Sequence, residues 1–259
     1  MPRANRYFLP GHVWHITHRC HQKDFLLKFS KDRRRWRYWL FEARKRFGLC
    51  VLNYVVTSNH IHLLVRDCGQ GEIAKSMQLI SGRTAQEYNQ RKGRKGAFWE
   101  DRYHATAVDS DKYLARCMVY IDLNMVRAGV VSYPGDWPCS GYCEIQAPPQ
   151  RYAVIDQKAL SELLGANSFE QCQLIHKGWV EDELKSKQLC RDTVWSQNIA
   201  VGHKDYVENI KMSLGVTGRF KSVRENEDVY ALKEPVVPYS AHCEHKMSTL
   251  SGDNTVLLE

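Results

Sequence analysis

Two histidines separated by one residue, His60 and His62, stand at the start of a short apolar run. Side chains alternate in direction along a β-strand, so both imidazoles would share one face while Ile61, Leu63 and Val65 occupy the other. Two imidazoles held side by side on a strand can chelate a divalent cation. Such a pair in isolation is more often two surface or hydrogen-bonded histidines, so a metal site needs further residues.

Tyr120 is the candidate nucleophile that the rest of the chain supplies. It lies in a predicted helix with Asn124 one turn later, and residues four apart share a helix face. An ordinary boundary tyrosine beside a surface amide is the alternative interpretation. Tyr113 and Tyr103 are rival nucleophiles, but neither has an asparagine at the following turn.

The four residues together predict phosphate chemistry. A phenol with a pKa of about 10 is a weak nucleophile. A cation held by His60 and His62 would polarise a phosphate and favour attack by Tyr120. Asn124 would add an oxygen ligand, and a mixed nitrogen and oxygen site with open positions suits Mg²⁺ or Mn²⁺.

The distribution of positive charge favours a nucleic-acid partner over an ordinary soluble basic protein. The net charge is +8; residues 31–46 hold eight Lys or Arg against two acids, and residues 91–95 form a second basic segment. Arginine can bind phosphate through paired hydrogen bonds. The candidate DNA-binding residues are Arg33, Arg34, Arg91, Lys92, Arg94, Lys95 and Arg102.

The longest apolar runs are far below the roughly 18 residues that a membrane helix needs. No apolar segment follows the basic start at residues 1–6, so we expect no secretion signal and a cytoplasmic, nucleoid-associated protein. Nine cysteines without a CxxC pair indicate ordinary reduced thiols.

Periodicity predicts the elements that would position these residues. Strands are expected at 12–19, 50–56, 61–66 and 105–108, and helices at 30–47, 73–90 and from 109 or 110 to about 128. Gly48 and Gly129 would end the first and third helices. This order predicts an α+β fold with a ferredoxin-like (split βαβ) antiparallel sheet and helices on one face.

The chain divides into three predicted parts. Residues 1–145 would form the catalytic domain, residues 146–232 a helical C-terminal region with a DNA-binding or regulatory role, and residues 233–259 a flexible tail. Prolines and glycines between residues 133 and 149 mark the linker.

Five segments in the same order make the sequence resemble the REP-associated branch of the one-tyrosine HUH transposases. They are Arg6–Gly11, Ser58–Leu64, Phe98–Tyr103, Tyr120–Gly129 and Trp137–Tyr142. The resemblance covers about residues 6–145 and continues more weakly to about residue 225. Met125 stands where a proline is expected, which leaves the proposed chemistry untouched.

The resemblance implies metal binding by His60 and His62, with Asn124 as the third metal-side residue and Tyr120 as the nucleophile. It also implies a 5′-phosphotyrosine intermediate, a free 3′-OH and a hairpin-forming single-stranded DNA substrate. The expected activity is that of a metal-dependent endonuclease and strand transferase acting on repeated palindromic elements.

Two other functions stay open from the sequence. A rolling-circle replication initiator shares the chemistry, and a DNA-hairpin or RNA-binding protein could keep the fold without catalysis. The protein could be a monomer or a homodimer. Among the histidines of the first strand, His15 or His18 could lie near the site, although a structural or DNA-facing role is the commoner one.

Overall fold

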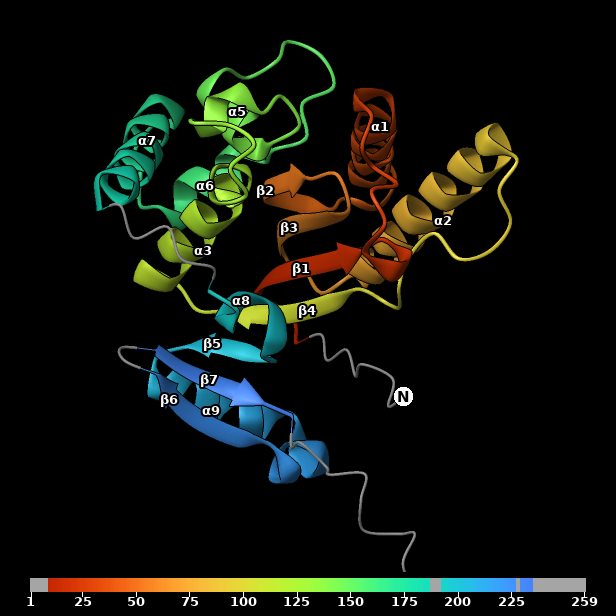
Figure 1. The fold of residues 1–259 in the computed structure, drawn as a ribbon. Helices are drawn as coiled ribbons and strands as arrows, with labels where there is room; N and C mark the ends of the chain where they lie inside the picture. The colour runs from red at the N-terminus through yellow and green to blue at the C-terminus, as the bar shows by residue number, and fades with distance from the viewer. Residues whose placement is uncertain (1–8, 187–191, 227–228, 235–259) are drawn as a thin grey trace, which may run out of the picture.

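The computed structural model of the chain describes residues 9–186, 192–226 and 229–234. Figure 1 shows a mixed α+β architecture in which one twisted sheet runs through the described part of the molecule. The predicted α+β class is therefore confirmed. The expected tail at 233–259 falls almost entirely outside the described residues.

The described strands form a single sheet in the order β2-β3-β1-β4-β5-β7-β6. All neighbours are antiparallel except β4 and β5. The strands are β1 (Val13–Arg19), β2 (Cys50–Val56), β3 (His60–Arg66), β4 (His104–Val108), β5 (Ala200–Gly202), β6 (Ser222–Asn226) and β7 (Val229–Lys233).

Helices cover both faces of this sheet. Those described are α1 (Ser30–Phe47), α2 (Glu72–Lys92), α3 (Lys112–Asp122), α4 (Asn124–Arg127), α5 (Gly141–Gln146), α6 (Gln157–Leu163), α7 (Phe169–Ser186), α8 (Val194–Gln197) and α9 (Lys204–Ser213). Three short 3₁₀ turns, His21–Lys23, Pro134–Asp136 and Gly215–Phe220, complete the described elements.

Neighbouring residues of β2 show which helix lies on which face. Asn53 donates to Asp122 of α3 at 3.0 Å, whereas the hydroxyl of Tyr54 accepts from Arg37 of α1 at 2.8 Å. Because successive side chains of a strand point to opposite faces, α1 and α3 lie on opposite sides of the sheet. The predicted placement of the helices on one face holds for α1 and α2 and is wrong for α3.

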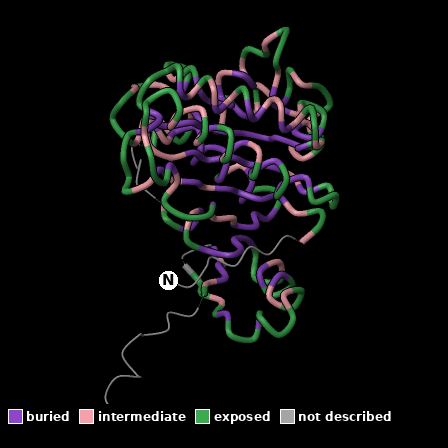
Figure 2. The backbone as a smooth tube through the Cα atoms, turned by 90° about the vertical axis from the view of Figure 1, so that its right-hand side faces the viewer, coloured by how far each residue is buried: buried purple, intermediate pink, exposed green. Residues whose placement is uncertain are grey.

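Buried strands occupy the centre of the molecule, and exposed residues lie mainly at loops and outer helix faces (Figure 2). Trp14, Ile16 and Leu63 are almost fully buried on the α1 and α2 side of the sheet. Gly48 ends α1 with a φ of +71°, the left-handed conformation that glycine adopts without strain, as the sequence predicts.

The structure differs from the sequence prediction after residue 110 and again after residue 197. The expected single helix to about residue 128 ends at Asp122, and a separate short helix begins at Asn124. The C-terminal region is not only helical, because β5, β6 and β7 extend the sheet. The ferredoxin-like detail and the division at residue 146 stay predictions.

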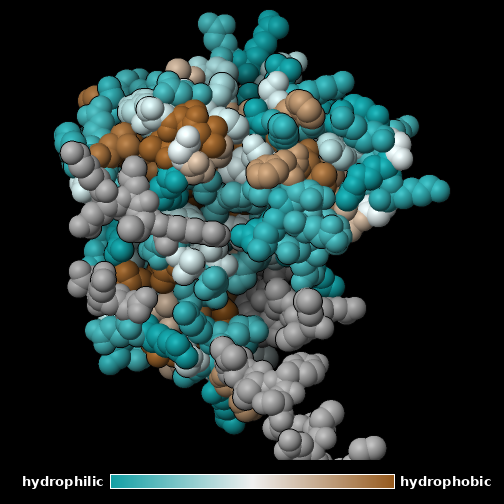
Figure 3. All heavy atoms as spheres, in the orientation of Figure 1, coloured by the Kyte–Doolittle hydropathy of each residue, from teal (hydrophilic) through white to brown (hydrophobic). Residues whose placement is uncertain are grey.

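None of the described helices is both long enough and apolar enough to cross a membrane. Hydrophilic side chains predominate on the face drawn in Figure 3, including the protruding end of α2.

Candidate active site

The histidine pair lies on a strand with neighbours on both sides. β3 is hydrogen-bonded to β1 and to β2, so its backbone is held along its length. The rings of His60 and His62 meet edge to face, with centroids 5.0 Å apart. His62 is 3% exposed, while His60 is partly exposed at the start of the strand. The predicted arrangement of both rings on one face is therefore present.

Hydrogen bonds at the turn before β3 orient His60. Its Nδ1 lies 2.7 Å from Oδ1 of Asn59 and 3.0 Å from the hydroxyl oxygen of Thr57. That hydroxyl donates its proton to the His60 carbonyl at 2.8 Å, so both oxygens act as acceptors for the imidazole N–H. Nδ1 therefore carries the proton, and Nε2 is the nitrogen that would bind a metal.

Asn124 reaches the second histidine. Its amide Nδ2 lies 3.1 Å from Nε2 of His62. Asn124 therefore lies beside the histidine pair, although it is on α4 and Tyr120 is on α3. The Tyr120 carbonyl at the break accepts a hydrogen bond from the guanidinium of Arg127, which satisfies a group near the end of the helix.

Tyr120 packs between the sheet and this guanidinium. Its ring meets the rings of His62 and His15 edge to face, at centroid distances of 5.6 and 6.0 Å. The Arg127 guanidinium lies over the phenol ring at 4.4 Å. Burial lowers the pKa of Arg127. A cation in this position attracts the negative charge that a phenol oxygen develops as it attacks.

The rival tyrosines face other partners. Tyr113 packs its ring against His203 at 4.7 Å, and the ring of Tyr103 meets His18 at 6.2 Å. Neither contact involves the histidine pair. The geometry therefore favours Tyr120 as the candidate nucleophile.

The donor set suits the expected cation. Two imidazole nitrogens and an amide give a mixed nitrogen and oxygen set, and a rotation of the Asn124 amide would exchange its nitrogen for its oxygen beside His62. Among the described residues, no three His, Cys, Asp or Glu side chains gather so that they could hold a metal ion. The candidate site thus depends on the Asn124 amide as its third protein donor.

A cleft of about 860 Å³ opens beside Tyr120. Its walls come from α3 and from the later helices α6, α7 and α8, and they carry charges of both signs. Residues that line it include Lys112, Arg116, Tyr120, Arg127, Glu162, Trp179, Glu183 and Trp195. The cleft has the volume for unpaired nucleotides next to the phenol.

The two predicted basic segments form one surface. Arg91, in the last turn of α2, makes an ion pair with Asp32 in the first turn of α1. Arg34 in the second turn of α1, Lys92 at the end of α2 and Lys95 just after it are exposed. We call this part of the molecule the basic end.

The other predicted DNA-binding residues are partly engaged in the protein itself. Arg33 donates to the Leu27 carbonyl at 3.0 Å and stacks on Trp137, and Arg94 donates to the Ala97 carbonyl at 2.8 Å. Arg102 is exposed on the loop before β4.

The basic end lies at the same end of the sheet as His60. The backbone of Leu27, just before α1, donates to the carbonyl of Ser58, just before β3, at 2.9 Å. Glu100 donates its backbone N–H to Arg19, whose register partner is His60. The exposed cations and His60 therefore lie at one end of the sheet.

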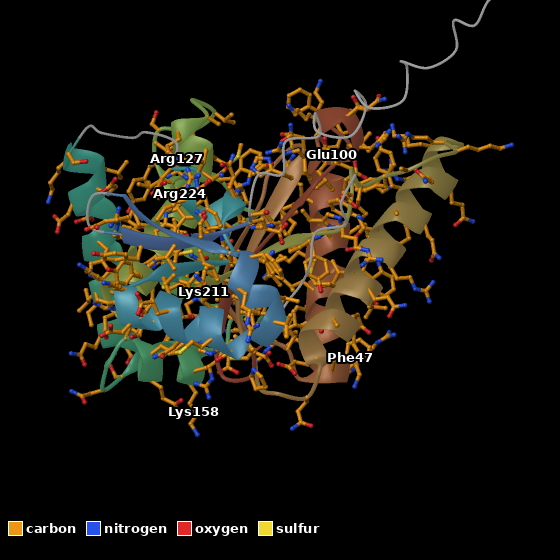
Figure 4. All side chains as sticks on the ribbon, turned by 90° about the horizontal axis from the view of Figure 1, so that it is seen from below. Phe47, Glu100, Arg127, Lys158, Lys211 and Arg224 are labelled. Carbon is orange, nitrogen blue, oxygen red and sulfur yellow. The ribbon has the colours of Figure 1, made fainter. Side chains whose placement is uncertain are left out.

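Figure 4 shows these two ends of the molecule from below. Glu100 and Arg127 lie along one edge of the view, and Phe47 and Lys158 lie along the opposite edge. Phe47 ends α1, so the far end of that helix is separated from the candidate site.

Sequence reasoning underestimated three residues of the site. His15 stacks on His62 with centroids 5.0 Å apart and contacts Tyr120, so the first strand does contribute a histidine. Burial lowers its pKa to about 4. The strand alternation was the signal for His15, because His18 points to the other face and stacks on Trp99. No pattern in the sequence indicated that Trp195 or Arg127 would lie at the site.

Comparison with known proteins finds a family model that matches the N-terminal part of the chain. Residues 10–124 match the family model described as "Transposase IS200 like", and the match ends at Asn124. A structure described as a REP-associated tyrosine transposase bound to a REP hairpin has 21% identity and a TM-score of 0.48, covering 57% of this chain and 87% of that one. A putative transposase from Deinococcus radiodurans R1 has 12% identity and a TM-score of 0.34, covering 49% and 95%. No curated protein matches the sequence.

Proposed function

We propose that the chain cleaves and joins single-stranded DNA through Tyr120, because residues 10–124 match the IS200-like transposase family model. Hairpin DNA is the proposed substrate, in keeping with the motif resemblance of the sequence. The observation that carries the proposal is that the Tyr120 ring and the Asn124 amide both contact the ring of His62.

Each step can be assigned to a side chain. The phenol of Tyr120 gives up its proton to water and its oxygen attacks the phosphorus, the bond to the 3′ oxygen breaks, and that oxygen takes up a proton from water and leaves as a 3′-OH. The chain then holds the 5′ end as a phosphotyrosine, and a 3′-OH reverses the step on a new or the same strand. Arg127 stabilises the charge on the phenol oxygen during the attack.

The histidines and Asn124 would hold Mg²⁺ or Mn²⁺. When bound, the cation would draw charge from the phosphate oxygens. His60 and His62 orient their Nε2 atoms from a strand that is paired on both sides, so little reorganisation is needed.

A labelled hairpin oligonucleotide incubated with the protein and Mn²⁺ tests this function directly. The expected result is a covalent, SDS-resistant adduct that disappears when EDTA replaces the cation. Bound but uncut DNA over a series of hairpins would instead support a binding protein on the same fold.

The double variant His60→Ala/His62→Ala is expected to lose the adduct and keep its affinity for the hairpin. The loss should be on the order of 10²-fold or more, because several kcal/mol of charge stabilisation disappear with the cation. Adduct yield and gel-shift affinity measured on one preparation separate the two effects. An adduct yield equal to that of the wild type would remove the histidines from the reaction.

Removal of charge at the basic end is expected to weaken binding in a salt-dependent way. For Arg34→Ala/Lys92→Ala/Lys95→Ala, the slope of log affinity against log salt should fall by roughly 2–3, since each lost phosphate contact removes about 0.7–0.9. The three side chains are exposed, so the fold should be unaffected.

The matched control removes the same charge from the opposite end of the molecule. Lys45, Arg46 and Lys158 are exposed at or near the far end of α1. Their triple alanine variant should keep the wild-type slope. Equal slopes for both triple variants would mean that the DNA does not follow the basic end.

A further inference from the structure

A chain of hydrogen bonds links the histidine pair to the C-terminal region. Nε2 of His15 lies 2.9 Å from Nδ1 of His62, and Nδ1 of His15 lies 2.7 Å from the backbone carbonyl oxygen of Trp195. His15 is fully buried, and its ring lies almost parallel to that of His62, with an interplanar angle of 5° that allows a hydrogen bond within the ring planes.

The direction of each hydrogen bond follows from the acceptor at the end of the series, which is the Trp195 carbonyl oxygen. A carbonyl oxygen can only accept, so Nδ1 of His15 must carry a proton. A neutral ring then has a lone pair on Nε2, and Nδ1 of His62 must donate to it. That leaves Nε2 of His62, the nitrogen facing Asn124, as an unprotonated donor atom for a cation. Full burial of His15 favours the neutral ring.

The Trp195 carbonyl is available because α8 is a single short turn. The last carbonyls of a helix have no partner within the helix. The position of α8 is fixed by its neighbours on β4, because the hydroxyl of Thr106 donates to the Asn198 carbonyl at 2.6 Å. Asn198 in turn donates its side-chain amide to the Val194 carbonyl at 2.6 Å.

We propose that His15 is a positioning residue, and that the Trp195 carbonyl acts through it to hold His62 in the tautomer that can bind a cation through Nε2. This inference rests on the proposed function. It gives the C-terminal region, which lies beyond the matched residues 10–124, a defined role in the metal site. His60 reaches the same tautomer by its own route, through Asn59.

The first test is spectroscopic and uses the metal-free full-length protein. Long-range proton–nitrogen spectra of ¹⁵N-histidine-labelled protein distinguish the two tautomers, and the His62 signals are assigned by their loss in His62→Gln. The wild type should show His62 protonated at Nδ1, and His15→Leu should show a mixture of tautomers. A wild-type His62 protonated mainly at Nε2 would overturn the proposal.

The second test measures Mn²⁺ affinity by calorimetry without DNA. His15→Leu should bind Mn²⁺ about 10–100-fold more weakly, the usual effect of losing a group that orients a metal ligand. His15→Gln retains a donor and an acceptor and should recover part of the affinity. Wild-type affinity in His15→Leu would also overturn the proposal.

His18→Leu is the matched control, because His18 lies on the same strand, is also buried, and faces Trp99 instead of His62. It should leave the His62 tautomer and the Mn²⁺ affinity unchanged. Thermal unfolding of each variant verifies that the protein is folded at the temperature of measurement. Because both readouts omit DNA, a wild type with the expected tautomers but no covalent adduct would refute the proposed function and leave the role of His15 intact.

Discussion

Tyr120→Phe is expected to abolish the covalent adduct with hairpin DNA while the hairpin still binds. Phenylalanine keeps the ring between His62 and Arg127 and removes only the oxygen that would bond to phosphorus. Loss of a nucleophile typically costs a factor on the order of 10³ or more in rate. The measurement is the yield of SDS-resistant adduct with Mn²⁺, beside the hairpin affinity of the same preparation.

Tyr113→Phe is the matched control on the same helix. Tyr113 is also buried, but its ring packs on His203 and not on His62 or Arg127 as the ring of Tyr120 does. Its adduct yield should stay near that of the wild type. If Tyr120→Phe forms the adduct and Tyr113→Phe does not, the nucleophile is Tyr113 and the proposed step is wrong.

His176→Ala is expected to lower the free energy of unfolding by about 1–3 kcal/mol, the usual cost of leaving a buried polar group without its hydrogen-bond partner. Nε2 of His176 lies 2.7 Å from Oδ2 of Asp122, and both side chains are fully buried. The second carboxylate oxygen of Asp122 accepts from Asn53 at 3.0 Å. Alanine would leave this carboxylate short of a partner and open a cavity beside it.

Urea unfolding followed by tryptophan fluorescence measures this loss. Lys177→Ala is the control, because the neighbouring Lys177 makes an exposed ion pair with Glu181 and should change stability by less than about 1 kcal/mol. A His176→Ala variant as stable as the control would mean that the buried pair contributes no net stability. Asp122 ends α3 two residues after Tyr120, so the pair also anchors the end of the helix that bears the nucleophile.

Patterns within short sequence segments predicted the elements whose formation depends mainly on neighbouring residues. Alternation located β1 and the hairpin of β2 and β3, and helical spacing with Gly48 located α1 almost to the residue. The helix break at Leu123 was missed because no proline or glycine marks it. Tyr120 and Asn124 nevertheless both reach the histidine site, since Asn124 starts a new turn directly after the break.

Non-local contacts explain what could not be predicted. The short strand β5 has only three residues, and it belongs to the sheet because it pairs with β4. The Trp195 carbonyl is a backbone atom, which leaves no signature in the residue type, yet it contacts His15 from far along the chain. The basic segments were predicted separately, and contacts such as the Arg91–Asp32 ion pair and the Lys92 ammonium over the Phe29 ring show that they adjoin.

Because β3 lies inside the sheet, different parts of the candidate site are expected to exchange their amide protons at different rates. Amide protons of a strand paired on both sides exchange with solvent mainly when a large part of the protein unfolds, whereas short helices at the surface open locally and often. His60 and His62 are thus expected to belong to the slowly exchanging part of the protein, whereas Asn124, on the four-residue α4, lies outside the strand pairing and is expected to exchange faster. If Asn124 is the third ligand, as we propose, it can adjust its position without disturbing the two imidazoles.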